Sequence, residues 1–267
     1  MTIGSPVIPR EHGGWAVVIT PMIAVFAAVR GISWQAVLLT AAALSAYLSY
    51  DPLNRLLIGV EQRGLSAEKL HQAKAWASIY LMIAAALFLV LLREGYTLLV
   101  IFAAVAAGLF LVHFILTRKA RGSLLRDLSG IAGLSMACPS MYYVLRGAVD
   151  RTAVILWLQV ALFFAGTIFY VHMKIETLRL KRNDLSPGER LYLGRWTLLS
   201  LAVMIVGAVA MSSTSLMPAI GILAFVPITV HTLFGIGRLN ARVNFRNLGL
   251  LLLGQSVVFG ILIGVLI

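Results

Sequence analysis

Nine apolar stretches of about 20 residues follow one another along almost the whole of this sequence. A helix of about 20 apolar residues crosses the hydrocarbon core of a bilayer, where every backbone N–H and C=O group must be paired within the protein. The stretches are therefore predicted to be transmembrane helices. They lie at 13–29, 33–50, 73–92, 97–117, 128–145, 152–173, 195–211, 216–235 and 248–267.

The composition supports a membrane protein over its whole length. Of the 267 residues, 60% are hydrophobic and only 12% are charged, and the mean hydropathy is +0.94. No polar or Pro/Ser-rich block is long enough to form a separate soluble domain. We expect residues 1–267 to form a single integral membrane domain, an all-α polytopic bundle of about nine transmembrane helices.

The positions of lysine and arginine predict how the chain is oriented. All but four of the 22 cationic residues fall at one end of the predicted helices. The four exceptions are Arg30, Arg93, Arg146 and Arg151. Because basic loops stay in the cytoplasm, the N-terminus is predicted inside and the C-terminus outside. The same loops account for the net charge of +12, so no nucleic-acid partner is expected.

Two long connections end in similar helix starts. Ser186, Pro187 and Glu189 have the pattern of a capping box, and Ser66 precedes Glu68 as a plainer N-cap. At an offset of 120 residues, four residues of the first half meet identical residues in the second. The four are Tyr50, Leu65, Ser66 and Trp76, which fall on Tyr170, Leu185, Ser186 and Trp196. This spacing indicates a duplicated four-helix unit.

The scarce polar residues gather at the predicted cytoplasmic ends of the helices. Ionisable groups at membrane depth usually face a bundle interior or a water-filled cavity, so the cluster predicts a ligand site. Its members are Glu11, His12, Asp51, Asn54, Arg55, His113, Arg118, Lys119, Tyr170, His172, Lys174, Glu176, His231 and Arg238.

Plainer roles exist for several of these residues. Arg118 and Lys119 are also topology determinants that can contact anionic lipid head groups. His113 and His231 can be core histidines that are hydrogen-bonded across helices. Asp51, beside Pro52 at the membrane boundary, can cap a helix.

The start of the chain resembles one membrane protein family. Residues 9–16 read Pro-Arg-Glu-His-Gly-Gly-Trp-Ala and are followed by Pro21 in the same helix. This opening looks like the signature of the bacterial YwiC-like membrane proteins. The resemblance implies a multi-pass protein of the bacterial plasma membrane, with membrane lipids around it, and no particular activity.

Helix number, orientation and loop lengths also resemble the UbiA superfamily of intramembrane prenyltransferases. That resemblance implies a cavity at the cytoplasmic side, where two aspartate-rich motifs hold Mg²⁺ on an isoprenoid diphosphate. The first motif is reduced here, because Asn54 and Ile58 stand where carboxylates are expected beside Asp51 and Arg55. Around the second, Lys174 stands near an expected aspartate and Glu176 supplies the carboxylate.

Three functions follow as hypotheses. The first is a UbiA-like transferase in which Asp51, Lys174 and Glu176 are catalytic, Mg²⁺ is the cofactor, and a lipophilic substrate is bound by the other members of the cluster. The second is a non-catalytic membrane protein that binds a quinone, an isoprenoid, haem or a protein partner. Haem would take its ligands from His12, His113, His172 and His231. A transporter ranks third, because the ionisable groups gather at one end instead of at mid-depth.

Overall fold

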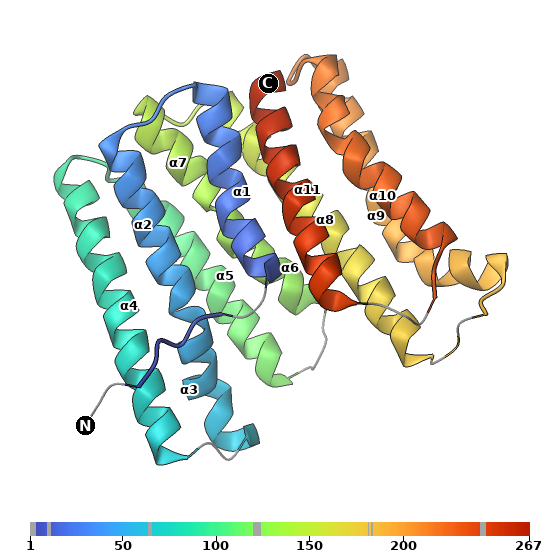
Figure 1. The fold of residues 1–267 in the computed structure, drawn as a ribbon. Coiled ribbons are helices and arrows are strands. Elements are labelled where there is room, and N and C mark those ends of the chain that lie inside the picture. Colours follow the sequence, from blue (N-terminus) through green and yellow to red (C-terminus); the bar gives the residue numbers. More distant parts are fainter. Residues whose placement is uncertain are drawn as a thin grey trace.

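A computed structural model describes residues 4–9, 12–63, 66–119, 124–180, 182, 184–240 and 244–267. Over these residues the chain is an all-α bundle, as predicted, with no strand (Figure 1). The helices are α1 (His12–Val29), α2 (Trp34–Leu48), α3 (Tyr50–Arg63), α4 (Ala67–Arg93), α5 (Leu99–Lys119), α6 (Leu124–Ser135), α7 (Ala137–Arg146), α8 (Arg151–Arg179), α9 (Pro187–Ser213), the 3-10 helix η1 (Ala219–Phe225), α10 (Val226–Gly237) and α11 (Phe245–Leu266).

The predicted spans are confirmed. Within the described ranges, eight helical segments are long and apolar enough to cross a membrane, and α1 is a shorter apolar helix among them. The eight segments are Trp34–Leu57, Ala67–Arg93, Leu99–Arg118, Leu124–Arg146, Arg151–Arg179, Pro187–Ser213, Ala219–Gly237 and Phe245–Leu266. The chain is therefore a multi-pass membrane protein.

Two predicted spans each contain a break between consecutive helices. The second passes from α2 to α3 at Ser49, and Pro52 lies in the first turn of α3. The fifth passes from α6 to α7 at Met136, and Pro139 lies in the first turn of α7. Proline suits a first turn because its missing N–H has no intrahelical acceptor there. The break at Ser49 directly precedes Tyr50 and Asp51, so it determines how these two side chains are presented.

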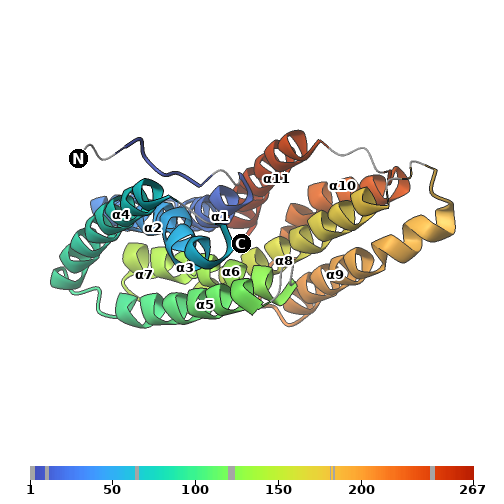
Figure 2. The same cartoon turned by 90° about the horizontal axis from the view of Figure 1, so that it is seen from below.

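The duplication predicted from the sequence has a structural counterpart. Helices α4 and α9 are both 27 residues long and begin 120 residues apart (187 − 67). Each begins at a serine N-cap, Ser66 or Ser186, and the predicted capping box of Ser186 with Glu189 is present. The first unit contains α2 to α7, and the second contains α8 to α11. Helices of the two units occupy opposite ends of an elongated bundle (Figure 2).

Helix α1 joins the two units and packs most extensively on α11. Gly260 approaches the backbone of Thr20, and Gly264 approaches the backbone of Ala24, so the two helices run parallel in close contact. These two small residues of α11, four positions apart, allow the close approach. Helix α1 also contacts α6, α7 and α8. It therefore lies between the two units, and the core is continuous across it.

We predict that Gly264→Leu destabilises the protein strongly, because a Cβ atom at this position would collide with the backbone oxygen of Ala24 and the Cβ of Ala27. Overpacking typically costs about 1–3 kcal/mol. Thermal unfolding in lipid nanodiscs should show a lower midpoint. Gly254→Leu is the matched control on the same helix, since no atom lies within 4 Å of its Cβ position. Equal midpoints for the two variants would contradict the close α1–α11 contact.

A second prediction concerns sidedness. The start of α4 binds the N-terminal segment, through Gln72 to the Ser5 carbonyl and Trp76 to the Gly4 carbonyl. The end of α11 lies at the other end of the bundle, where α1 also ends (Figure 1). Tags fused to the two termini should therefore be accessible from opposite sides of the membrane, the N-terminal tag from the cytoplasm. Access to both tags from the same side would overturn this topology.

Candidate functional site

A cavity of about 620 Å³ lies inside the first unit. Helix α4 packs on α2 and α5 packs on α6, and the cavity separates these two pairs. Its wall is almost entirely apolar: the polar side chains in it are Tyr47, Ser49, Tyr50 and Ser140, and none of its residues is charged. Ligand pockets of proteins commonly have volumes of about 300–1,000 Å³, with apolar walls and a few polar groups. The cavity has the size and lining of a site for a lipophilic molecule.

The cavity exists because alanines face it. Ala43 and Ala84 line it, whereas the residues 120 positions further on are Phe163 and Met204, each only 1% exposed. In the second unit Phe163 stacks on Phe259 with ring centroids 4.1 Å apart. At these two positions the second unit thus has large buried side chains where the first unit has small ones. The alanine-rich faces of 42–46, 84–85 and 103–107 were the signal in the sequence.

The N-terminal residues of the chain support part of the cavity wall. A Cβ atom on Gly14 would overlap the hydroxyl of Tyr47, so the glycine makes room for this side chain. Trp15 packs edge-on against the Tyr47 ring at 5.1 Å between centroids, and its Nε1–H donates to the Pro9 carbonyl. The Gly-Gly-Trp sequence therefore positions Tyr47, which lines the cavity.

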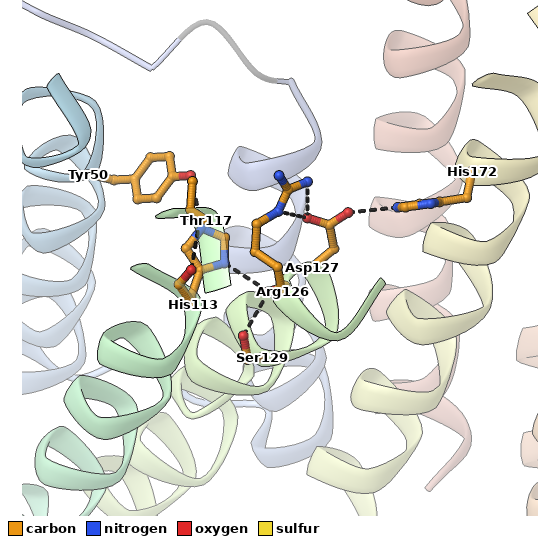
Figure 3. Close-up of polar contacts among 7 residues, drawn as sticks. All are labelled: Tyr50, His113, Thr117, Arg126, Asp127, Ser129 and His172. Carbon is orange, nitrogen blue, oxygen red and sulfur yellow. Dashed lines mark hydrogen bonds and ion pairs between the residues drawn. The ribbon is translucent and has the colours of Figure 1, made fainter. Parts of the chain in front are cut away.

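A polar network extends from the cavity wall to the second unit (Figure 3). Tyr50 lines the cavity, and its hydroxyl lies 3.1 Å from Nε2 of His113 on α5. Nδ1 of His113 lies 2.9 Å from the carbonyl oxygen of Arg126 on α6. The Arg126 guanidinium binds Oδ1 of Asp127 at 2.7 Å, and Oδ2 of Asp127 lies 2.7 Å from Nε2 of His172 on α8.

The contacts of His113 determine its tautomer when the ring is neutral. A carbonyl oxygen only accepts, so Nδ1 carries the proton and donates to the Arg126 carbonyl. Nε2 then accepts from the Tyr50 hydroxyl. Gly130 leaves the space that the His113 ring occupies, because a Cβ atom there would lie 2.9 Å from Nδ1. His113 is thus a buried histidine hydrogen-bonded across helices, one of the two roles that the sequence left open.

The second unit repeats the tyrosine–histidine pair. The hydroxyl of Tyr170, 120 positions after Tyr50, lies 3.4 Å from Nε2 of His231, and Nδ1 of His231 lies 2.9 Å from Oε1 of Gln255. Both ring nitrogens of His113 and of His231 therefore have partners. Neither histidine is available as a haem ligand without losing one of these bonds.

Asp127 is the site residue that the sequence analysis missed. It stands next to Arg126 in the first turn of α6, where the pair resembles an ordinary surface ion pair. The packing of α6 against both α5 and α8 places its carboxylate between the two units instead. The sequence signal was a carboxylate beside Arg126 at the start of a largely apolar helix, in a chain with only ten acidic residues.

The residues predicted on α3 and α5 take separate partners. Asp51 forms an ion pair with Arg55 one turn later, at 2.8 Å. Oδ1 of Asn54 is buried without a hydrogen-bond partner among the described residues. Arg118 reaches across to α3 and donates to the Leu57 carbonyl at 2.8 Å. These cationic groups lie near the end of the cavity that holds Tyr50 but do not line it.

The three residues predicted to be catalytic do not meet in one site. Asp51 is paired on α3, whereas the buried Lys174 on α8 donates to the Gly235 carbonyl on α10 at 3.0 Å. Glu176 is exposed and lines a different cavity, between α8 and α9. In the described part of the chain, no three His, Cys, Asp or Glu residues are arranged to hold a metal ion. Glu11 and the side chains of His12 and Lys119 lie outside the described residues.

Fold and site together define a multi-pass helical membrane protein with a ligand-sized apolar cavity in its first four-helix unit. A family model described as YwiC-like protein matches residues 8–142, half of the chain, and the chain belongs to this family. The matched region contains every residue that lines the cavity, together with Tyr50, His113 and Asp127. No curated protein matches the chain.

We predict that Asp127→Ala destabilises the contact between the two units, because Arg126 and His172 both lose their acceptor. Leaving a partly buried charged group without its partner costs about 1–3 kcal/mol. Thermal unfolding in nanodiscs should show a lower midpoint for this variant. Glu68→Ala, at an exposed position in the first turn of α4, is the control and should unfold like the unaltered protein. An unchanged midpoint for Asp127→Ala would show that this network does not contribute to the stability of the protein.

Proposed function

We propose that this protein binds a lipophilic molecule of the isoprenoid or quinone type in the cavity of its first unit. The observation that carries the proposal is the 620 Å³ apolar space between the α2–α4 and α5–α6 pairs. Leu81 and Leu111 in its wall are 43% and 61% exposed, so the cavity is open to the surrounding bilayer and a lipophilic molecule can enter it from there. The plasma membrane of a bacterium, the location we propose for the protein, offers lipophilic molecules to such a site.

The lining supports a neutral head group. The polar side chains of the wall are hydroxyls, from Tyr47, Tyr50, Ser49 and Ser140. A diphosphate would need cations to offset its charge in this setting, and Arg55 and Arg118 are held by Asp51 and the Leu57 carbonyl outside the wall. Tyr50 stacks on Phe114 with centroids 5.8 Å apart, so an aromatic surface lies beside its hydroxyl. A flat quinone ring suits this end through aromatic contact, because the Tyr50 hydroxyl hydrogen is already donated to His113.

A UbiA-like transferase is the second candidate. It is favoured by the nine apolar helical segments and by the Asp51–Arg55 pair one turn from Tyr50. The separation of Asp51 from Lys174 and Glu176 supports binding over transfer, because transfer of an isoprenoid needs carboxylates that converge on metal-bound diphosphate.

Filling the cavity tests the proposal. Decylubiquinone and geranylgeranyl diphosphate are the probes, each measured by equilibrium binding to protein in nanodiscs, with and without Mg²⁺. We expect decylubiquinone to bind and Ala107→Phe, a substitution in the wall, to weaken it at least about fivefold by steric overlap. Ala104→Phe, exposed on the same helix and outside the wall, is the matched control.

Each alternative outcome has a definite reading. Mg²⁺-dependent binding of geranylgeranyl diphosphate with no binding of decylubiquinone would replace the proposal with the transferase. Binding of decylubiquinone that is equally weakened by Ala107→Phe and Ala104→Phe, or by neither, would exclude the cavity as its site.

A further inference from the structure

A second cavity, of about 560 Å³, lies on the other side of the polar network. Residues of α8 and α9 form most of its wall, with Leu124 of α6 at one edge. Leu162, Leu199 and Val203 make an apolar section, and Leu199 and Val203 are more than half exposed, so this section is open to the surrounding bilayer. His172 and Glu176 form its polar section, toward the end of α8.

Asp127 orients His172 in this wall. Its Oδ2 lies 2.7 Å from Nε2 of His172, and a carboxylate only accepts, so Nε2 is the donor. The charge of Asp127 is already balanced by the Arg126 guanidinium on Oδ1. In the neutral imidazole the lone pair is therefore on Nδ1. The neutral imidazole of His172, held by Asp127, thus has a hydrogen-bond acceptor at Nδ1.

The other polar groups of the wall are acceptors as well. Thr197 donates its hydroxyl hydrogen to the Phe169 carbonyl, and Ser200 donates its own to the Thr197 carbonyl. Their oxygens can then only accept, as does the carboxylate of Glu176. Among the described side chains that line this cavity, Nε2 of His172 donates to Asp127, and the indole N–H of Trp196 is the other nitrogen donor. A molecule that binds here must supply hydrogen-bond donors.

We propose that this second cavity binds an amphiphile with a hydroxylated aromatic head, a phenol or quinol, whose hydroxyl donates to Nδ1 of His172. The head lies between His172 and Glu176, beside the aromatic side chains of Phe169 and Trp196. The apolar tail follows Leu162 and Val203 into the bilayer. This site is separate from the cavity of the first unit, shares no lining residue with it, and does not depend on the function proposed there.

A pair of ligands that differ only in the donor tests the proposal. A 4-alkylphenol with a photoreactive diazirine in its tail is crosslinked to the protein in nanodiscs, and labelled peptides are identified by mass spectrometry. We expect labelling in α8 and α9. 4-Dodecylphenol should suppress this labelling at a concentration about three- to tenfold lower than its methyl ether, 4-dodecylanisole, because the ether lacks the hydroxyl hydrogen. His172→Phe should abolish this difference between the competitors, and His172→Gln, which keeps an acceptor, should retain part of it.

A second pair of variants keeps the proposal testable if His172→Phe fails to fold. Val203→Trp fills the cavity and should reduce labelling of α8 and α9, whereas Val206→Trp, exposed on the same helix outside the wall, should not. Ala107→Phe should leave this labelling unchanged. The proposal would be overturned if the phenol and its ether competed equally. It would also be overturned if labelling were confined to α4 and α5, or were uniform over all lipid-facing helices.

Discussion

The close contact between α1 and α11 is the interaction on which the rest of the bundle depends. Apolar side chains gain little by leaving lipid for another apolar helix, so association in a bilayer requires backbones that approach closely and pack well. Gly260 and Gly264 provide this approach to Thr20 and Ala24. The contact ties the first helix to the last, and α1 also contacts helices of the first unit. Both units are thereby held on one central helix.

The two units have kept the same framework and diverged in what fills them. The serine N-caps, the tyrosine–histidine pairs and the 120-residue spacing recur in both halves. The interior differs, because alanines such as Ala43 and Ala84 leave space where Phe163 and Met204 fill it. The space in each unit therefore lies at a different place, between the α2–α4 and α5–α6 pairs in the first and between α8 and α9 in the second. The cavity of the first unit lies in the part of the chain that the family model matches, whereas the cavity between α8 and α9 lies mostly outside it.

The first turn of α6 lies between the two cavities and contacts a histidine on each side. On one side the Arg126 carbonyl holds His113 against Tyr50, at a wall rich in hydroxyls. On the other, Asp127 holds His172 so that its lone pair is left for a donor. Because adjacent residues of one helical turn fix both histidines, a shift of α6 that alters one site also moves the other.

The sequence by itself determined that the chain folds in a lipid bilayer, how many apolar helices it has, and the N-caps of α4 and α9. These depend on local composition and on short-range backbone pairing, which the bilayer enforces strictly. It also predicted that His113 and His231 could be core histidines, and the spacing of Tyr50 and Tyr170 indicated the repeat. Only the tertiary structure decided which polar residues share a site. Asp51, Lys174 and Glu176 have different neighbours, because the packing of each helix places Asp51 beside Arg55, Lys174 beside α10 and Glu176 in the wall of the second cavity. Asp127 belongs to the polar network because α6 packs against both α5 and α8. Contacts between helices that are distant in sequence leave no local pattern in the chain.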